Sequence, residues 1–206
     1  MSSPDEARFD DPARQLGADL QAFGAAYRDA EVSSRPVLSV SHAGWHPGAR
    51  IGARTAGGSL LAYNDSGHAA ELLFDESPQP IGNIWGDGFR GNFIRRPFSI
   101  VNVRQHGVSG EIAEGAEKLE LISQDGTVFD ADIVARTFGV TIDLDLPYER
   151  QMGELREAGA STDEILDVLF GSDTGEQQRA ATRHLTVRVY DGNDTVLHEG
   201  PVFEDD

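Results

Sequence analysis

The first regular pattern along the chain is a stripe of apolar positions near the N-terminus. Apolar residues recur there at spacings of three and four, at Leu16, Leu20, Phe23, Tyr27 and Ala30. This period is that of an α-helix with one buried face. Asp11 followed by Pro12 is typical of an N-cap and a first helical residue. We predict that residues 1–31 form an acidic tail and a docking helix over 11–31.

Beyond residue 36 the apolar positions form short runs that are typical of β-strands. These runs cover residues 37–41, 60–63, 70–74 and 93–105. Stretches rich in glycine and proline, residues 44–58 and 78–91, separate them, and we expect long loops there. Loops of this length in a compact domain are usually functional or mobile.

The C-terminal half carries two hairpin patterns. Strand-like runs over 118–123 and 127–133 flank a turn signature at Asp125 and Gly126, and a second pair of runs flanks Asp191 and Gly192. Between them, residues 140–144 alternate apolar with polar side chains, which indicates a strand with one buried face. The chain therefore ends in a predicted hairpin.

A helical insert is predicted over residues 147–170, before the last hairpin. Pro147 starts one helix and Gly159 ends it, and Ser161 with Glu164 matches a capping box that starts a second. We therefore predict an α+β fold. It consists of a mainly antiparallel β-sheet or barrel-like domain over 32–206, with an N-terminal helix and a two-helix insert.

Composition places the chain among globular proteins, because 39% of its 206 residues are hydrophobic and 23 more are glycine. Cysteine is absent, which excludes disulfides, thiolate metal sites and cysteine nucleophiles. We find no signal-peptide pattern and no apolar run of membrane-spanning length. We expect a protein without a membrane span, located in the cytoplasm or in a virion.

Charge is the strongest compositional feature. The chain has 35 acidic and 17 basic residues, for a net charge of -18, and Lys118 is its single lysine. This charge opposes direct readout of duplex nucleic acid, which needs clustered positive charge. The Asp surplus and the scarcity of lysine favour a halophilic setting, since about 1 M salt shortens the Debye length to about 3 Å. A GC-rich genome combined with an acidic surface is the alternative.

The charge is unevenly distributed, and this suggests a contact surface. Residues 32–110 carry five acids and seven arginines, whereas residues 111–206 carry 23 acids and seven bases. Interface cores are enriched in aromatic residues and arginine. We predict binding to other protein subunits, in a homo-oligomer or a hetero-assembly. The predicted contact residues are Arg90, Arg95, Arg96, Arg104, Trp45, Trp85 and Phe93. The alternative is that this segment is the core sheet of a monomer.

Enzyme motifs are weak by comparison. The glycines of residues 86–91 have dinucleotide-binding spacing without the required strand and helix, and we expect no cofactor. His42, His46 and His68 supply three imidazoles of the kind that hold a catalytic zinc. We therefore expect a non-enzymatic structural or adaptor subunit of a larger assembly in a halophilic setting. A virion neck, tail or capsid is one such assembly. The alternative is a metal-dependent enzyme that uses these three histidines.

Overall fold

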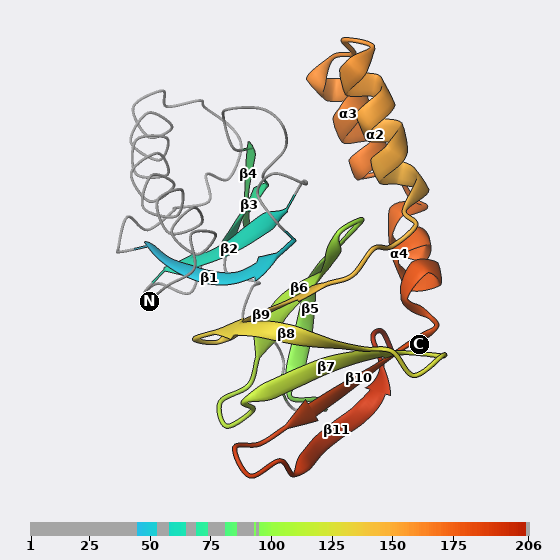
Figure 1. Ribbon diagram of the computed structural model, residues 1–206. Coiled ribbons are helices and arrows are strands. Elements are labelled where there is room, and N and C mark those ends of the chain that lie inside the picture. Colours follow the sequence, from blue (N-terminus) through green and yellow to red (C-terminus); the bar gives the residue numbers. More distant parts are fainter. Residues whose placement is uncertain are drawn as a thin grey trace.

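The structure is a computed structural model that describes residues 45–52, 58–64, 69–73, 81–85, 93 and 95–204 (Figure 1). It is an α+β fold dominated by antiparallel strands, as the sequence predicts. The helix predicted over 11–31 and the strand predicted over 37–41 lie outside these residues. The described elements, in chain order, are β1 (Trp45–Ile51), β2 (Ser59–Asn64), β3 (Ala69–Leu73), β4 (Ile81–Trp85), β5 (Phe98–Arg104), β6 (Gly107–Ile112), β7 (Lys118–Ser123), β8 (Val128–Val134), β9 (Thr137–Thr141), α2 (Pro147–Glu157), α3 (Thr162–Leu169), α4 (Thr174–Thr182), β10 (Leu185–Tyr190) and β11 (Val196–Pro201).

Seven strands form the larger sheet, in the antiparallel order β11-β10-β7-β8-β9-β6-β5. Both predicted hairpins are confirmed, as β7–β8 and β10–β11. In the first turn, the Thr127 amide donates to the Asp125 carboxylate at 3.0 Å. In the second, the amides of Asn193 and Thr195 each donate to the Asp191 carboxylate at 2.8 Å. Local turn chemistry therefore fixes the register of both hairpins.

The larger sheet curls so that its two edge strands, β5 and β11, meet through side chains. The rings of Phe98 and His198 pack edge to face with centroids 5.3 Å apart. Arg96, just before β5, donates from Nη1 to the Val202 carbonyl at 2.8 Å, and its guanidinium lies 4.5 Å from the Phe98 ring centroid. These contacts close one end of the curled sheet around its core.

The core lies inside this curled sheet and is built by the alternation of apolar and polar residues along its strands. The side chains buried there include Phe98, Val108, Leu119, Leu121, Phe138, Val140, Val187 and Val189. Beyond β9 the predicted alternation of burial continues to Leu144, although the ladder ends at Thr141. The amides of Ile142 and Leu144 donate to the carbonyls of His106 and Gln105 at 3.2 and 2.7 Å instead.

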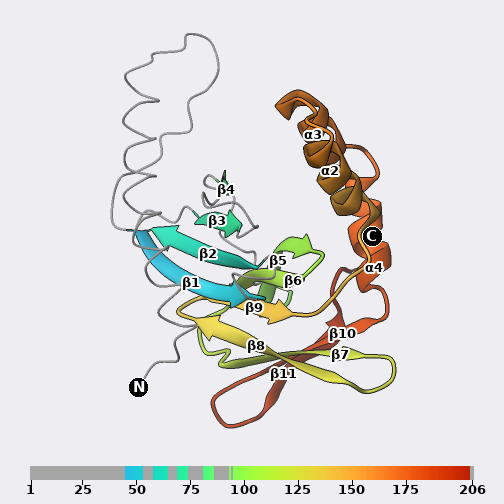
Figure 2. The ribbon, with the colours of Figure 1, turned by 45° about the horizontal axis from the view of Figure 1, so that its top comes forward.

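The smaller sheet, β1-β2-β3-β4, rests on the larger one through β1, which lies across β9, β8 and β6 (Figure 2). The Ala49 amide donates to Thr137 Oγ1 and the Gly52 amide donates to Thr141 Oγ1, both at 2.8 Å. Gly139 of β9 permits this approach, because a Cβ there would lie 2.3 Å from the Arg50 carbonyl oxygen. The two sheets therefore meet at backbone contact distance.

Two stretches predicted as long loops contain strands, and this corrects the sequence interpretation. Residues 44–58 contain β1, and residues 78–91 contain β4. Proline and glycine obscured β1 because its register shifts between Pro47 and Arg50, the kind of irregularity at which strands tolerate proline. Gly48 is needed there, since a Cβ would lie 2.6 Å from Thr137 Oγ1.

The insert before the last hairpin contains one helix more than predicted. α2 begins at Pro147, as expected, and the Ser161–Glu164 capping box at the start of α3 is confirmed. α4 follows directly and was missed, because Thr174–Thr182 has few apolar residues to reveal a buried face. We call residues 147–182 the helical arm.

We expect Gly139→Ala to lower the free energy of unfolding by about 1–3 kcal/mol, the usual range for forcing extra volume into a packed site. The new methyl group would push β1 off β9. Chemical denaturation measures the change. Gly153→Ala in α2 is the control, because a Cβ there meets nothing within 4 Å, and it should be neutral or stabilising by up to about 1 kcal/mol. Equal losses in the two variants would contradict the packing described.

His198 should make stability pH-dependent. Burial lowers the pKa of its imidazole and the Arg96 guanidinium lowers it further, while Glu204 opposes them. The unfolded chain then binds this proton at a higher pH than the folded chain does, so stability falls as pH drops below about 6.5. Thermal unfolding between about pH 7.5 and 5.5 should show a shallower loss for His198→Gln than for wild type. Parallel slopes would contradict this expectation.

Candidate protein-binding surface

Arg104, one of the predicted contact residues, is buried inside the chain and only 8% exposed. Its Nη2 lies 2.9 Å from Glu71 Oε2, and its Nη1 lies 3.4 Å from Glu149 Oε1. Asn102 donates its side-chain amide to the same Glu71 oxygen. Burial lowers the pKa of Arg104, but the two carboxylates outweigh burial and the net shift is upward. Arg104 therefore stays charged and joins β3, β5 and α2.

The remaining predicted arginines that the structure describes lie at the other end of β5. Arg96 is half-buried against Phe98 and Val202. The Arg95 side chain is 83% exposed, with Nη1 3.7 Å from Glu204 Oε2. Arg104 lies eight positions beyond Arg96 along largely extended chain, a span of roughly 26 Å. The structure therefore does not gather these arginines into one patch.

The structure describes only some of the aromatic residues and histidines that the sequence analysis singled out. Phe93 is half-buried, with the Arg136 guanidinium 5.9 Å from its ring centroid. For Trp45, His46 and Trp85 the structure describes the backbone alone, and Arg90, His42 and His68 lie outside the described residues. Within the described part of the chain, no three histidine or acidic side chains form a metal-binding group. The contact role of the two tryptophans and the histidine site stay predictions.

The helical arm stands away from both sheets and is fixed at its base (Figures 1 and 2). Tyr148 donates its hydroxyl hydrogen to the Val103 carbonyl at 2.9 Å, and Gln178 donates to the Tyr148 oxygen at 3.1 Å. The backbone amide of Gln105 donates to Glu149 Oε2 at 2.6 Å. Burial, together with the nearby Glu149 carboxylate, raises the pKa of Tyr148 to about 12, so the hydroxyl stays protonated. These bonds set the direction in which the arm leaves the sheet.

α3, which packs beside α2 in the arm, has apolar residues on two faces. Ile165, Val168 and Leu169 pack against the core cluster that continues along α2. Leu166 and Phe170, one turn apart on the other face, are 39% and 77% exposed. Exposed Asp163 and Asp167 lie on this same face by helical spacing. We call Asp163, Leu166, Asp167 and Phe170 the outer stripe.

Other exposed apolar side chains are less suited to binding. Val196 and Leu197 are each 47% exposed on edge strand β11. The β10–β11 register shifts opposite them, and Pro201 ends the strand, two features that discourage pairing with a further strand. Val128 stands alone on β8. The outer stripe is thus the stronger candidate for a binding surface.

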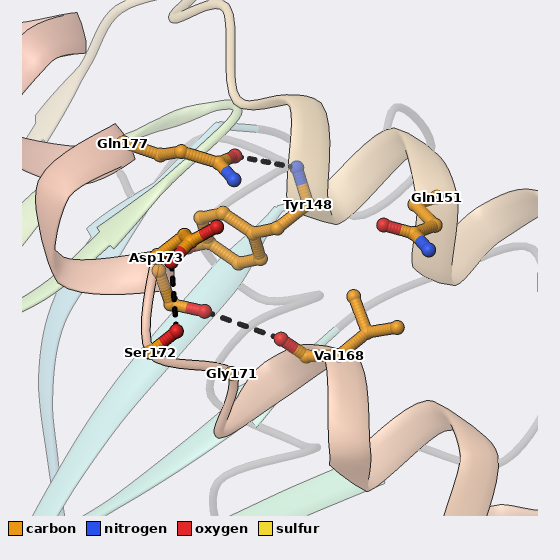
Figure 3. A pocket seen from close by; sticks show the side chains of 8 residues that line it. Tyr148, Gln151, Val168, Gly171, Ser172, Asp173 and Gln177 are labelled. Atoms are coloured by element: carbon orange, nitrogen blue, oxygen red, sulfur yellow. Dashed lines mark hydrogen bonds between the residues drawn. The ribbon is translucent and has the colours of Figure 1, made fainter.

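A polar pocket of about 250 Å³ lies where α2, α3 and α4 join (Figure 3). Its side chains bond to neighbouring parts of the arm: Gln177 Oε1 accepts from the Tyr148 amide at 2.9 Å, and Thr174 donates to the Val168 carbonyl at 3.2 Å. Neither histidine nor cysteine lines it, and the Ser172 hydroxyl donates to the neighbouring Asp173 carboxylate at 2.7 Å. We interpret it as the joint of the arm.

Comparison with family models, curated proteins and solved structures finds no match. Among the residues that the structure describes, no helix is long and apolar enough to cross a membrane.

The outer stripe was missed because the second helix of the insert was predicted from the sequence without assigning its apolar residues to faces. A signal was present: residues 162–170 include five large apolar side chains, Ile165, Leu166, Val168, Leu169 and Phe170. These cannot all fit on one face of a helix of that length. The direction of α2 decides which of them are covered.

We expect Arg104→Met to lower the free energy of unfolding by about 3–5 kcal/mol, because it leaves two carboxylates near a buried site without their cation. Arg150→Met is the matched control, since its pair with Asp145 at 2.9 Å is exposed and should contribute less than about 1 kcal/mol. Urea denaturation of both variants checks this. A loss below about 1 kcal/mol for Arg104→Met would show that the buried pairs are dispensable.

Proposed function

We propose that this protein is a non-enzymatic structural or adaptor subunit of a larger protein assembly. The observation that carries the proposal is Phe170, 77% exposed beside Leu166 at the C-terminal end of α3, in an arm fixed by hydrogen bonds at its base. Exposed apolar side chains that form a contiguous patch mark contact sites more often than single exposed apolar side chains do. The outer stripe is the proposed contact surface.

Energetics support this choice of surface. Covering a phenylalanine side chain contributes about 1.5–3 kcal/mol, and aromatic residues are frequent among the few that dominate binding. Fixing the arm beforehand lowers the entropic cost of association, because the helix need not be ordered on binding. A fixed arm with an exposed apolar pair therefore has the features of a docking element rather than those of a catalytic site.

We propose that this larger assembly functions in a halophilic setting. A virion is one example of such an assembly. The acidic surplus supports high salt, since a net charge of -18 repels itself least where screening is strong. No described group favours the metal-dependent alternative, whose histidines His42, His46 and His68 lack described side chains.

The test is the mass of the protein purified from its source at about 3 M and about 0.15 M salt. Wild type should elute in a complex of fixed stoichiometry at the higher salt, well above the 22.3 kDa of one chain. Leu166→Ser with Phe170→Ser should release the single chain, because the apolar contact is lost. Leu197→Ser, equally apolar but outside the stripe, should remain in the complex. A wild-type protein that is monomeric at both salts would overturn the proposal.

A further inference from the structure

We propose that the outer stripe binds a basic amphipathic helix of a partner protein. Apolar side chains of the partner would cover Leu166 and Phe170, and its lysines or arginines would pair with Asp163 and Asp167. This inference rests on the proposed function and names the chemistry of the partner.

The amphipathic helix follows from the two apolar faces of α3. Ile165, Val168 and Leu169 already pack inward, while Leu166 and Phe170 face away. A helix that is apolar on opposite sides has the composition of one buried between two neighbours. α2 is the neighbour on one side, and the described chain supplies none on the other. A partner helix with apolar residues at matching spacing would complete a three-helix packing.

The positive charge of the partner follows from the surroundings of the stripe. α3 contains no lysine or arginine, and the whole arm has eight acids and three arginines. Within the described part of the chain, Asp163 and Asp167 enter no ion pair or side-chain hydrogen bond. Their carboxylates alternate with Leu166 and Phe170 along one helix face. A partner that covers the apolar pair would therefore meet a negative rim, which favours lysine and arginine at its own edges.

A second copy of this chain fits the stripe poorly. Facing stripes would bring the Asp163 and Asp167 carboxylates of two copies together, and each chain carries a net charge of -18. The apolar area is also small, since Phe170 and Leu166 together expose roughly 200 Å² of side chain. A stable homodimer covers about 800 Å² on each partner. A single helix is an occupant of suitable size and charge.

The test uses a synthetic helical peptide of about 18 residues, built from leucine and lysine with one apolar face. A scrambled peptide of the same composition and a leucine–glutamate peptide are the comparison probes. Fluorescence anisotropy should show the amphipathic basic peptide binding wild type at least about tenfold more tightly than either comparison. The scrambled peptide controls for non-specific attraction to an acidic protein.

Variants locate the binding. Phe170→Ser should weaken binding of the amphipathic basic peptide at least about tenfold, and Leu197→Ser should leave this binding unchanged. Asp163→Asn with Asp167→Asn should weaken it about fivefold at low salt. Glu114→Gln with Glu117→Gln removes two exposed charges at the opposite end of the sheet and should have no effect. Circular dichroism confirms that each variant is folded.

Four results would overturn the inference: equal binding of the scrambled peptide, equal losses in Phe170→Ser and Leu197→Ser, a Phe170-dependent dimer, or Phe170-dependent binding to anionic vesicles. Tighter binding of the leucine–glutamate peptide, lost in Phe170→Ser, would reject a basic partner while leaving the stripe as a docking surface. The proposed function fails separately, if the purified wild-type protein is a monomer.

Discussion

The arrangement of the molecule depends on one buried arginine held between two carboxylates. Arg104 joins Glu71 of the smaller sheet to Glu149 of the helical arm and itself belongs to the larger sheet. Removing three charges from water is costly, and their attraction offsets that cost only when the geometry is kept. Glu71 is fully buried, and Asn102 donates to the same oxygen as Arg104. A network of this kind therefore favours one relative placement of the two sheets and the arm over others.

Arg104 is one of several arginines in residues 32–110 that bind groups of the same chain. The described arginines of residues 32–110 contact acids or carbonyls of the same chain, and most of these partners belong to the acidic C-terminal half. Arg50 bonds to Asp132, and Arg95 lies near Glu204. Arg96 bonds to the Val202 carbonyl, and Arg104 contacts Glu149 as well as Glu71. The partners of these arginines therefore lie within the chain, mostly across long sequence separations. The sequence pattern is the same whether an acidic partner belongs to this chain or to another.

Sequence reasoning succeeded where structure is local and failed where it is not. Asp125 and Asp191 specify their turns, and Pro147 and the Ser161–Glu164 box start their helices, because each acts on residues within a few positions. β1 was missed because its glycine, Gly48, serves a close contact with Thr137 of β9, some ninety residues away. The pairing of residues 71, 104 and 149 and the exposure of Phe170 depend on packing partners that no short window contains. The candidate site therefore became visible only in three dimensions.

The acidic charge and the exposed apolar pair are physically compatible. An exposed phenylalanine and leucine on the surface of an arm would ordinarily favour association between copies. Here Asp163 and Asp167 adjoin the pair, and the strongly acidic C-terminal half carries repulsion over a Debye length of about 8 Å at physiological salt. In about 1 M salt that length shrinks to about 3 Å, so only charges in direct contact still discriminate between partners. At high salt, the choice between binding partners would then depend on the Asp163 and Asp167 carboxylates. These are the charges close enough to contact a partner that covers Leu166 and Phe170.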